Sequence, residues 1–576
     1  MEEINSQRYN LSVWRVNVRD KSFTRETVPN TWERLGGRGL VARILVDEVP
    51  PTCEPLGSYN KLLFTPGLLV GHMLSSCDRI SIGGKSPLTG GVKEANAGGK
   101  TGLKLTFLGI KALIIEDKPV DNNWNILYLN PDGVKFEKAD DYVGLGVYDT
   151  TKKIIENYGE NIAIALIGPG GEKQLLSAGI ENLDKENNPS RIAARGGLGS
   201  VMGSKKIKAI IIDAKNGQKP PIAQPDEYRA AQKIFTKALM EAAQTAVYRD
   251  YGTPAMARMS NGFGGIPTRN FSSGQYENVE TISGEFMREV ILKRGGDGEP
   301  THACMPGCTI RCSNNYPDAD GKSIVSPLEY ETIGLMGSNL GISDLDIIAK
   351  LNWMVNDLGL DTIEIGASLG VAAKVGLMNF GDGMRAMQLI DEIKLNTPLG
   401  RLLGSGATTT GKVLGVEQVP VVKGQAMSAY EPRAIKGTGV TYATSPQGAD
   451  HTSGLTIRAK INHLDPNGQA DLSRTVQINM AGYDTLGACI FTGPGFSSAP
   501  ETIRDLLNSR YDWDVGVDIL QVLGKESLKL EHEFNKKAGF TSADDRLPEW
   551  MYRDPLPPNN AVFDVSDEDL DGLYNW

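Results

Sequence analysis

The sequence predicts an α+β fold, in which a pseudo-symmetric β-sheet domain at the N-terminus precedes mainly α-helical domains. Apolar runs of strand length recur within residues 1–215, as is typical of buried strands. Two stretches of that region resemble each other, which indicates a duplicated strand unit. Beyond residue 215, apolar residues recur at helical spacing instead.

Strands are predicted throughout the N-terminal third. Residues 11–18 alternate between apolar and polar side chains, and residues 111–115 and 162–167 are continuous apolar runs. Residues 98–116 (GGKTGLKLTFLGIKALIIE) and 196–213 (GGLGSVMGSKKIKAIIID) each place paired glycines before Lys-Ala and an aliphatic strand. Chance similarity of two glycine-rich hairpins is the alternative. A true duplication would form two backbone cradles, which suit two copies of one anionic ligand because backbone N–H groups bind phosphate.

A linker separates this part from the helical part. Residues 216–224 (NGQKPPIAQ) contain the glycine and prolines of a linker. Helices are predicted at residues 225–248, where Pro-Asp-Glu is typical of a helix start, and at residues 344–356.

A third part begins near residue 415. It is glycine-rich at first, and a helix is predicted from Ser473. The tail, residues 555–576, is acidic and rich in proline, so we expect it to pack over the surface or to be exposed. The predicted domains are therefore residues 1–215, 216–414 and 415–576.

Composition excludes several classes of protein. A chain of 576 residues is too long for one hydrophobic core, and no apolar run reaches membrane-spanning length. The formal charge of −10 argues against nucleic-acid binding. The acidic N-terminus lacks a signal pattern, and six cysteines are too few for a disulfide scaffold. We therefore expect a cytoplasmic protein that binds neither nucleic acid nor a membrane.

Three cysteines at four-residue intervals are the strongest candidates for a metal centre. Cys304, Cys308 and Cys312 lie in the segment THACMPGCTIRCSN, and Cys489 is a fourth candidate far downstream. The proline and glycine within the segment predict an irregular loop, which can turn three sulfurs towards one centre. Three clustered cysteines and one distant cysteine match the ligand count of an iron–sulfur cluster. Structural zinc and a coincidence of buried cysteines are the alternatives.

Short motifs in one order along the chain resemble those of the tungsten-containing aldehyde:ferredoxin oxidoreductases. They are GGRGL (36–40), DRISIGGKSPLTG (78–90), ANAGG (95–99), RGGLGSVMGSK (195–205), PTRNF (267–271), EYET (329–332), DLGLDT (357–362), AYEPR (429–433), GADH (448–451) and DTLGAC (484–489). The resemblance covers nearly the whole chain. It implies two twisted β-sheets related by a pseudo-twofold axis, two mainly helical domains after them, and oxidation of aldehydes to carboxylates.

The resemblance also implies the cofactors. A tungsten atom would be held by the dithiolenes of two molybdopterins beside a 4Fe–4S cluster, and molybdenum stays open because the pterins supply the ligands. Asn96 and the backbone at Gly196 would lie near a Mg²⁺ ion that bridges the pterin phosphates and keeps its waters. Taken alone, these would be ordinary turn residues. The cofactor-binding residues implied are Arg79, Asn96, Gly98, Arg195, Gly196, Gly197, Asn356, Gly359, Leu360, Asp361, Asp484 and Gly487.

Both copies of the pterin motif depart from the family pattern, Asp-x-x-Gly-Leu followed by Asp or Cys. Asn356 replaces the leading Asp of the first copy, and Ala488 replaces Leu in the second. An amide oxygen accepts the same N–H bonds as a carboxylate, so the first change keeps the contact without the charge. Cys489 ends the second copy and completes the cysteine set, which would place the two cofactors side by side.

Two further features bear on electron transfer. Three residues separate the first two cysteines of the cluster, where the commonest family pattern has two, and this changes the loop but not the ligand count. Arg79 resembles the family residue that lies between cluster and pterin, where a fixed cation would raise the cluster's potential. A surface arginine is the alternative.

The reaction requires a proton shuttle and a group that orients the substrate. His451 is the candidate shuttle, because the pKa of an unperturbed imidazole suits proton transfer near neutrality. Glu331 is its candidate carboxylate partner, and Tyr430 is the candidate hydrogen-bond donor to the substrate oxygen. All three match family active-site positions. The alternatives are a capping histidine, a solvated glutamate at a helix start and a core tyrosine; the other histidines, His302 among them, are interpreted as structural.

Other functions stay open at this stage. The same cofactor run backwards would reduce a carboxylic acid or an aromatic acyl-CoA. A radical S-adenosylmethionine enzyme is disfavoured by the cysteine spacing and by Cys489, and an electron-transfer or scaffold subunit with a cluster but no tungsten is a non-enzymatic alternative. The expected partners are a small aldehyde and ferredoxin or an iron–sulfur subunit. A homodimer and a hetero-oligomer are both compatible with the sequence.

Overall fold

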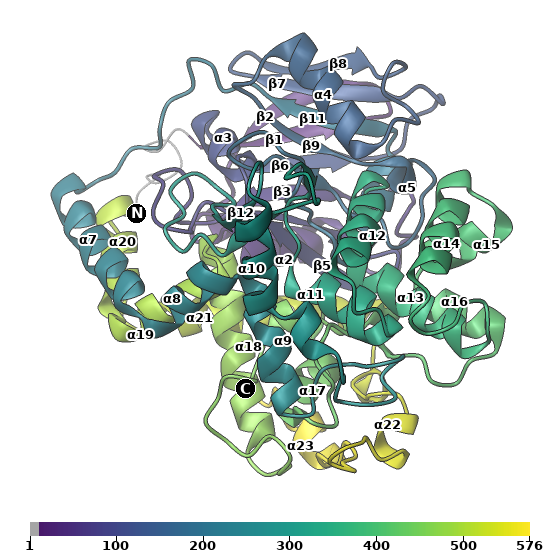
Figure 1. Ribbon diagram of the computed structural model, residues 1–576. Coiled ribbons are helices and arrows are strands. Elements are labelled where there is room, and N and C mark those ends of the chain that lie inside the picture. Colours follow the sequence, from purple (N-terminus) through teal and green to yellow (C-terminus); the bar gives the residue numbers. More distant parts are fainter. Residues whose placement is uncertain (1–10) are drawn as a thin grey trace.

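Two β-sheets dominate the N-terminal part of the computed structural model, which describes residues 11–576 (Figure 1). The first sheet has six strands in the order β2-β1-β6-β3-β4-β5, and the second has five in the order β10-β9-β11-β7-β8. The strands are β1 (Ser12–Asn17), β2 (Ser22–Thr27), β3 (Leu62–Pro66), β4 (Ile80–Lys85), β5 (Val92–Ala97), β6 (Ile110–Glu116), β7 (Asn125–Asn130), β8 (Gly133–Lys138), β9 (Ala163–Leu166), β10 (Glu181–Asn182) and β11 (Ile207–Ile212).

The two sheets repeat one topology, which confirms the predicted pseudo-symmetry. In each, the first strand of a hairpin (β1 of β1–β2, β7 of β7–β8) pairs in parallel with a late strand (β6, β11). That late strand also pairs antiparallel with an intermediate strand (β3, β9). A helix follows each hairpin and another precedes each late strand. These helices are α2 (Gly37–Glu48) and α3 (Thr101–Phe107) in the first half, and α4 (Val147–Tyr158) and α6 (Leu198–Ser204) in the second; the second half also contains α5 (Pro169–Glu172).

Alternation along the strands buries both faces of each sheet. In β1, Trp14 and Val16 belong to a core cluster that also contains Leu127 and Leu129 of β7, so the two sheets pack face to face. Val13, which precedes Trp14, packs into a different cluster, with helices on the other face. The strands predicted at residues 11–18, 111–115 and 162–167 are confirmed as β1, β6 and β9, and the glycine-led repeats are α3–β6 and α6–β11.

Helices make up most of the chain beyond residue 215. They are α7 (Pro225–Glu241), α8 (Ala243–Tyr251), α9 (Met256–Gly262), α10 (Gly284–Arg294), α11 (Tyr330–Thr332), α12 (Leu345–Asp357), α13 (Thr362–Lys374), α14 (Gly383–Leu395), α15 (Pro398–Gly404), α16 (Ala407–Leu414), α17 (Lys436–Thr444), α18 (Gln469–Leu486), α19 (Gly493–Ser498), α20 (Glu501–Tyr511), α21 (Ile519–Ala538), α22 (Trp550–Arg553) and α23 (Asp567–Asp571). Among them lie the short strands β12 (Glu299–His302), β13 (Ser313–Pro317), β14 (Ser323–Val325), β15 (Val421–Val422) and β16 (Gln425–Ala426). Single helical turns that matter below are η2 (Arg195–Gly197), η7 (His451–Ser453) and η8 (Ile490–Thr492).

The helix predictions hold with local corrections. The helix predicted at residues 225–248 is two helices, because Ala242 adopts an extended conformation between α7 and α8. Asp344 caps α12 by accepting from the backbone of Asp346. The helix expected from Ser473 begins four residues earlier, directly after Gly468, whose φ of 76° excludes it from the helix. In the C-terminal tail, apolar side chains such as Leu556, Phe563 and Leu570 are buried in the largest core cluster.

Helices of the N-terminal and C-terminal parts share one core cluster. Helix α2 of the N-terminal part packs against α18 and α21 of the C-terminal part. Buried Arg38 of α2 forms a two-bond ion pair with Glu531 of α21, at 2.7 and 2.8 Å, and lies 3.3 Å from Asp484 of α18. The domain boundaries at 215 and 414 stay predictions. Within residues 11–576, no helix has the length and apolar character that a membrane span needs.

We predict that Gly524→Ala destabilises the contact between α18 and α21. A Cβ on Gly524 would lie 1.9 Å from the backbone oxygen of Ile478, so the two helices would have to separate. Overpacking of this kind costs about 1–3 kcal/mol, and thermal melting measures it. Gly262→Ala is the control, because a Cβ added there would have nothing within 4 Å. Equal melting temperatures for the two variants would contradict the close packing.

Candidate active site

Three of the four candidate cysteines lie on one irregular loop, and the fourth, Cys489, lies beside it. Residues 303–312 lie between β12 and β13 without helix or strand, as predicted. The hydrogen-bonded thiol of Cys304 lowers the pKa of Cys308 to about 5. Burial raises the pKa of Cys312 and of Cys489, and the Cys308 thiol is close enough to both to raise it further. The distant fourth cysteine therefore lies with the other three.

The segment after β3, residues 67–79, holds this group together. Ser76 Oγ donates to Cys308 Sγ at 3.3 Å, while the carbonyl of Ser76 accepts from the backbone N–H of Cys489 at 2.9 Å. One residue of the N-terminal part thus contacts a cysteine of the loop and orients the backbone of the remote cysteine. This bridging explains why residues so far apart in sequence meet here.

The two copies of the predicted pterin motif dock at equivalent positions of the two half-domains. Arg79 N donates to Gly487 O at 3.1 Å, and Gly179 N donates to Gly359 O at 3.0 Å. Arg79 and Gly179 lie equally far beyond the ends of β3 and β9. Gly359 and Gly487 have φ values of 69° and 78°, a left-handed conformation that glycine adopts without strain. The pseudo-symmetry of the sheets therefore extends to the helix ends that dock on them.

Backbone approaches backbone at both docking points. A Cβ on Gly67 would lie 2.1 Å from Gly487 N, and a Cβ on Gly168 would lie 2.4 Å from the carbonyl carbon of Leu358. Any larger residue at Gly67 or Gly168 would push the motif away. Glycine is thus required on the sheet side as well as in the motif.

The leading and fifth positions of the first copy also contact the N-terminal part. Leu360 forms an isolated antiparallel bridge with Ala178. The buried Asn356 lies beside the hydroxyl of Tyr148 on α4. The amide that replaces the family's leading aspartate is therefore accommodated next to a phenol.

Arg79, Asn96 and Asp484 form one connected group next to the cysteines. Arg79 Nε donates to the side-chain oxygen of Asn96, and Asn96 Nδ2 donates to Asp484 Oδ1 at 2.7 Å. Burial opposes the charge of Arg79, but the thiols of Cys489 and Cys304 favour it and raise its pKa. Gly98 lies two residues after Asn96, and a Cβ there would lie 3.2 Å from Cys304 Sγ.

The equivalent turn of the second half-domain surrounds Arg195. Its Nε lies 3.1 Å from Asp361 Oδ2, at the end of the first pterin motif. Gly196 and Gly197 follow with φ values of 80° and 75°. The side chain of Lys93 packs over this turn, since a Cβ on Gly196 would lie 2.4 Å from its Cγ. Strand β5, which contains both Lys93 and Asn96, therefore links the two half-sites.

The three predicted catalytic residues meet. Glu331 Oε1 lies 3.5 Å from His451 Nε2, and Glu331 Oε2 accepts from the backbone N–H of Ala429 at 2.7 Å. The ring of Tyr430 lies 6.0 Å from that of His451, between centroids. Burial raises the pKa of Glu331, and the nearby imidazole of His451 opposes the rise. Residues from α11, a loop and η7 are thus assembled into one polar group.

Sequence reasoning missed the residues that join these groups. Ser428 Oγ lies 2.8 Å from His451 Nδ1 and accepts from Arg195 Nη1 at 3.2 Å, so it connects the candidate shuttle to the second half-site. Buried Lys93 pairs with Asp450, the neighbour of His451, at 2.7 Å. Ser428 directly precedes the AYEPR motif and Asp450 lies within GADH, but neither position indicates its partner.

Several buried polar atoms here lack a hydrogen-bond partner among the described residues. They include the Oε1 atoms of Glu94, Glu331 and Gln425. Burial and the charge of Asp484 raise the pKa of Glu94 to about 8. Buried polar groups are almost always hydrogen-bonded in folded proteins, so these atoms indicate a polar ligand. Together with the glycine turns and the four thiols, they fit a large polar cofactor and an adjacent iron–sulfur cluster.

Comparison with known proteins agrees with the motifs over the whole chain. The sequence model of the aldehyde ferredoxin oxidoreductase N-terminal domain matches residues 13–214, and the model of domains 2 and 3 matches residues 230–575. The tungsten-containing aldehyde ferredoxin oxidoreductase of Thermococcus kodakarensis is 32% identical over 585 residues, which cover 96% of this chain and 92% of that protein. The protein of the same name from Pyrococcus abyssi is 31% identical over 584 residues, which cover 95% and 93%.

A solved structure shares the fold. The active-site complex BamBC of benzoyl coenzyme A reductase with 1,5-dienoyl-CoA superposes with a TM-score of 0.79, covering 99% of this chain and 93% of that chain at 19% identity. That likeness establishes the architecture: paired sheets followed by helical regions. Because the family models match both parts of the sequence and the relatives extend over nearly all of it, this chain belongs to the aldehyde ferredoxin oxidoreductase family.

Proposed function

We propose that this protein oxidises aldehydes to carboxylates at a tungsten centre held by two molybdopterins, and that the electrons leave through a 4Fe–4S cluster. The observation that carries the proposal is the docking of both pterin motifs at equivalent positions, the second of which ends in Cys489 beside the cysteine loop. Family membership supports the reaction class, and the relatives from Thermococcus kodakarensis and Pyrococcus abyssi are named tungsten-containing enzymes.

Each group would have its own set of residues. Cys304, Cys308, Cys312 and Cys489 would hold the cluster. Arg79, Gly98, Asn96, Asp484 and Gly487 would bind one pterin, and Arg195, Gly196, Gly197, Asn356, Gly359, Leu360 and Asp361 would bind the other. Asn96 and the backbone at Gly196 would lie near the Mg²⁺ ion, and β5 supports this because it contacts both half-sites. When bound, the tungsten centre would supply an oxygen nucleophile and an acceptor for the electron pair.

The protein's own part in the reaction is positioning and proton transfer. Oxidation of an aldehyde to a carboxylate consumes water and releases protons, which need an acceptor. When Ser428 accepts from His451 Nδ1–H, the lone pair on His451 Nε2 is free to take a proton, and Glu331 stabilises the resulting imidazolium. Tyr430 would donate its hydroxyl hydrogen to the substrate oxygen. Tyr430 is buried, and the side chains of Glu331 and His451 are only 16% and 19% exposed, so water screens these charge interactions less than it would at the surface.

The cysteine loop is also the proposed exit for electrons. On one side, Arg79 donates to Asn96, which in turn bonds to Asp484. On the other side, Arg79 lies close enough to the thiols of Cys304 and Cys489 for them to raise its pKa. On the loop itself, Gly307 and Arg311 are exposed. Ferredoxin or an iron–sulfur partner subunit would therefore approach this side, in the cytoplasm.

Elemental analysis of anaerobically purified protein tests the cofactor set. We expect about one tungsten and four irons per chain, together with turnover of aliphatic or aromatic aldehydes when a low-potential acceptor is present. Iron without tungsten or molybdenum would favour an electron-transfer subunit instead. Tungsten together with reduction of a carboxylic acid or aromatic acyl-CoA, but no aldehyde oxidation, would favour the reductive alternative.

Cys489→Ala should abolish the cluster signal in electron paramagnetic resonance, because it removes one of the four ligands. Cys77→Ala is a matched control: its thiol is also buried and lies close enough to Cys489 and Cys308 to feel their charge, yet it has no proposed ligand role. A normal spectrum from Cys489→Ala would show that the fourth ligand is another residue.

His451→Asn should retain tungsten and iron but lower kcat for aldehyde oxidation by about 100-fold or more, the usual contribution of a proton-transfer group. The amide keeps a polar group near Ser428 but has no titratable nitrogen. The control is His532→Asn on α21, where the ring packs against Tyr574. Wild-type turnover by His451→Asn would exclude the shuttle role.

A further inference from the structure

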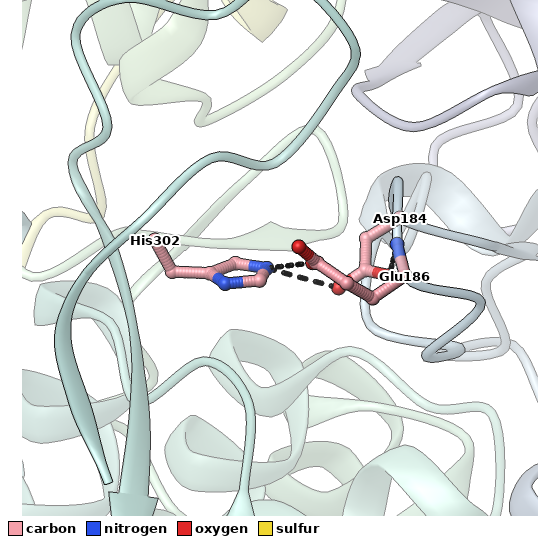
Figure 2. A group of neighbouring side chains, drawn as sticks. All are labelled: Asp184, Glu186 and His302. Carbon is pink, nitrogen blue, oxygen red and sulfur yellow. Dashed lines mark hydrogen bonds and ion pairs between the residues drawn. The ribbon is translucent and has the colours of Figure 1, made fainter. Parts of the chain in front are cut away.

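A second group of metal-ligand side chains lies outside the proposed active site (Figure 2). Asp184 and Glu186 follow β10 in the N-terminal part, and His302 ends β12, at the entrance to the cysteine loop. His302 Nε2 lies 3.1 Å from Asp184 Oδ2 and 3.0 Å from Glu186 Oε2. Figure 2 shows the imidazole edge pointing between the two carboxylates. His302 was expected to be a structural residue, but its imidazole contacts two carboxylates from another segment of the chain.

The surroundings orient each of these ligand atoms. His302 Nδ1 is 2.8 Å from Glu299 Oε2, so a third carboxylate holds the far side of the ring. Asp184 Oδ1 accepts from the backbone N–H groups of Glu186 and Asn188, at 2.9 Å each. Asp184 Oδ2 faces the imidazole and also accepts two longer bonds, from Asn188 Nδ2 at 3.3 Å and from Ser190 Oγ at 3.4 Å. A carboxylate on the second nitrogen of a histidine is the usual support of a metal-bound imidazole.

The hydrogens of the imidazole do not satisfy both carboxylates. One imidazole nitrogen carries at most one hydrogen, yet Nε2 faces carboxylate oxygens of both Asp184 and Glu186. A single N–H shared between two anions bonds weakly to each, and the two oxygens repel one another. Asp184 and His302 are buried, at 0% and 5% side-chain exposure, so water can screen this repulsion only from the side of the half-exposed Glu186. A divalent cation in place of that hydrogen would neutralise both oxygens.

The spacing of the atoms suits such an ion. The three ligand atoms, one from each residue, all lie within 4.8 Å of one another. In a tetrahedral zinc site with bonds of about 2.0 Å, ligand atoms are separated by about 3.3 Å. The observed 3.0 and 3.1 Å separations from the imidazole need to widen by only a few tenths of an ångström. Glu186 is 46% exposed, which leaves a route for the ion and a position for water.

We propose that Asp184, Glu186 and His302 bind one divalent transition-metal ion of the zinc class. An imidazole with two carboxylates is a donor set that zinc accepts, whereas Mg²⁺ and Ca²⁺ prefer oxygen ligands alone. The ion joins the loop after β10 to the strand that leads into the cysteine loop, and so fixes that loop against the N-terminal part. This site does not depend on the tungsten centre or on aldehyde oxidation.

Zinc titration of the full-length holoprotein tests the site directly. Protein purified anaerobically is dialysed against a chelator and then titrated with Zn²⁺ alone by isothermal calorimetry, with iron and tungsten measured in the same sample. We expect one site per chain. Glu186→Gln should weaken it at least tenfold, Glu299→Gln by about 10- to 100-fold as an outer-shell change, and Asp184→Asn should abolish it. Glu289→Gln, an exposed glutamate on α10, should bind as the wild type does.

The outcomes are distinguishable. Absence of zinc binding to the wild type would overturn the proposal and identify the group as an ion-pair cluster around a protonated imidazole. Equal zinc affinity in the wild type and in Glu186→Gln would overturn it too, by placing the ion elsewhere. Asp184 also organises its loop, so Glu186→Gln, whose side chain is half exposed, keeps the test valid if Asp184→Asn misfolds. If the wild-type protein binds zinc but does not oxidise aldehydes, that result would contradict the proposed function and leave the zinc site standing.

Discussion

Close backbone contact between two helix ends that carry glycines and equivalent segments of the two half-domains is the constraint on which the rest depends. Helices α12 and α18 each end just before a left-handed glycine, and the carbonyl of each glycine accepts a hydrogen bond from the sheet domain. Gly67 and Gly168 lie so close to the backbone of the two helix ends that neither position has space for a side chain. Because both docking points are set by backbone atoms, the side chains of Asp361, Asp484 and Cys489 enter the site from fixed positions.

Buried charge is the second organising feature. Arg38, Arg79 and Arg195 are all largely removed from water, and each is matched by a carboxylate or a thiol. Such pairs contribute little net stability because desolvation offsets their attraction, but loss of one partner leaves a costly unpaired charge. Burial and Arg38 act in opposite directions on Asp484, and burial prevails, raising its pKa to about 6. The network therefore specifies geometry and charge around the site more than it stabilises the fold.

The sequence predicted much of the fold because its signals were local. Alternation and apolar runs identified β1, β6 and β9, and the glycine-led repeats corresponded to α3–β6 and α6–β11. The helix at residues 225–248 was predicted without its break, because nothing in the residues around Ala242 indicates an extended conformation. The irregular cysteine loop was predicted from its proline and glycine. The docking of α2 against α18 and α21 was not predictable, since no pattern in one helix specifies its partners.

The sequence by itself determined which residue types are present and in what order: four cysteines, two variants of one motif, and the Glu331, Tyr430 and His451 set. Only the tertiary structure decided which of them meet. Ser428 joins His451 to Arg195, and His302 lies between Asp184 and Glu186, through contacts between segments remote in the chain. Periodicity and spacing describe neighbours along one element, whereas these distances follow from how separate elements pack, and packing is set by the summed contacts of the whole chain.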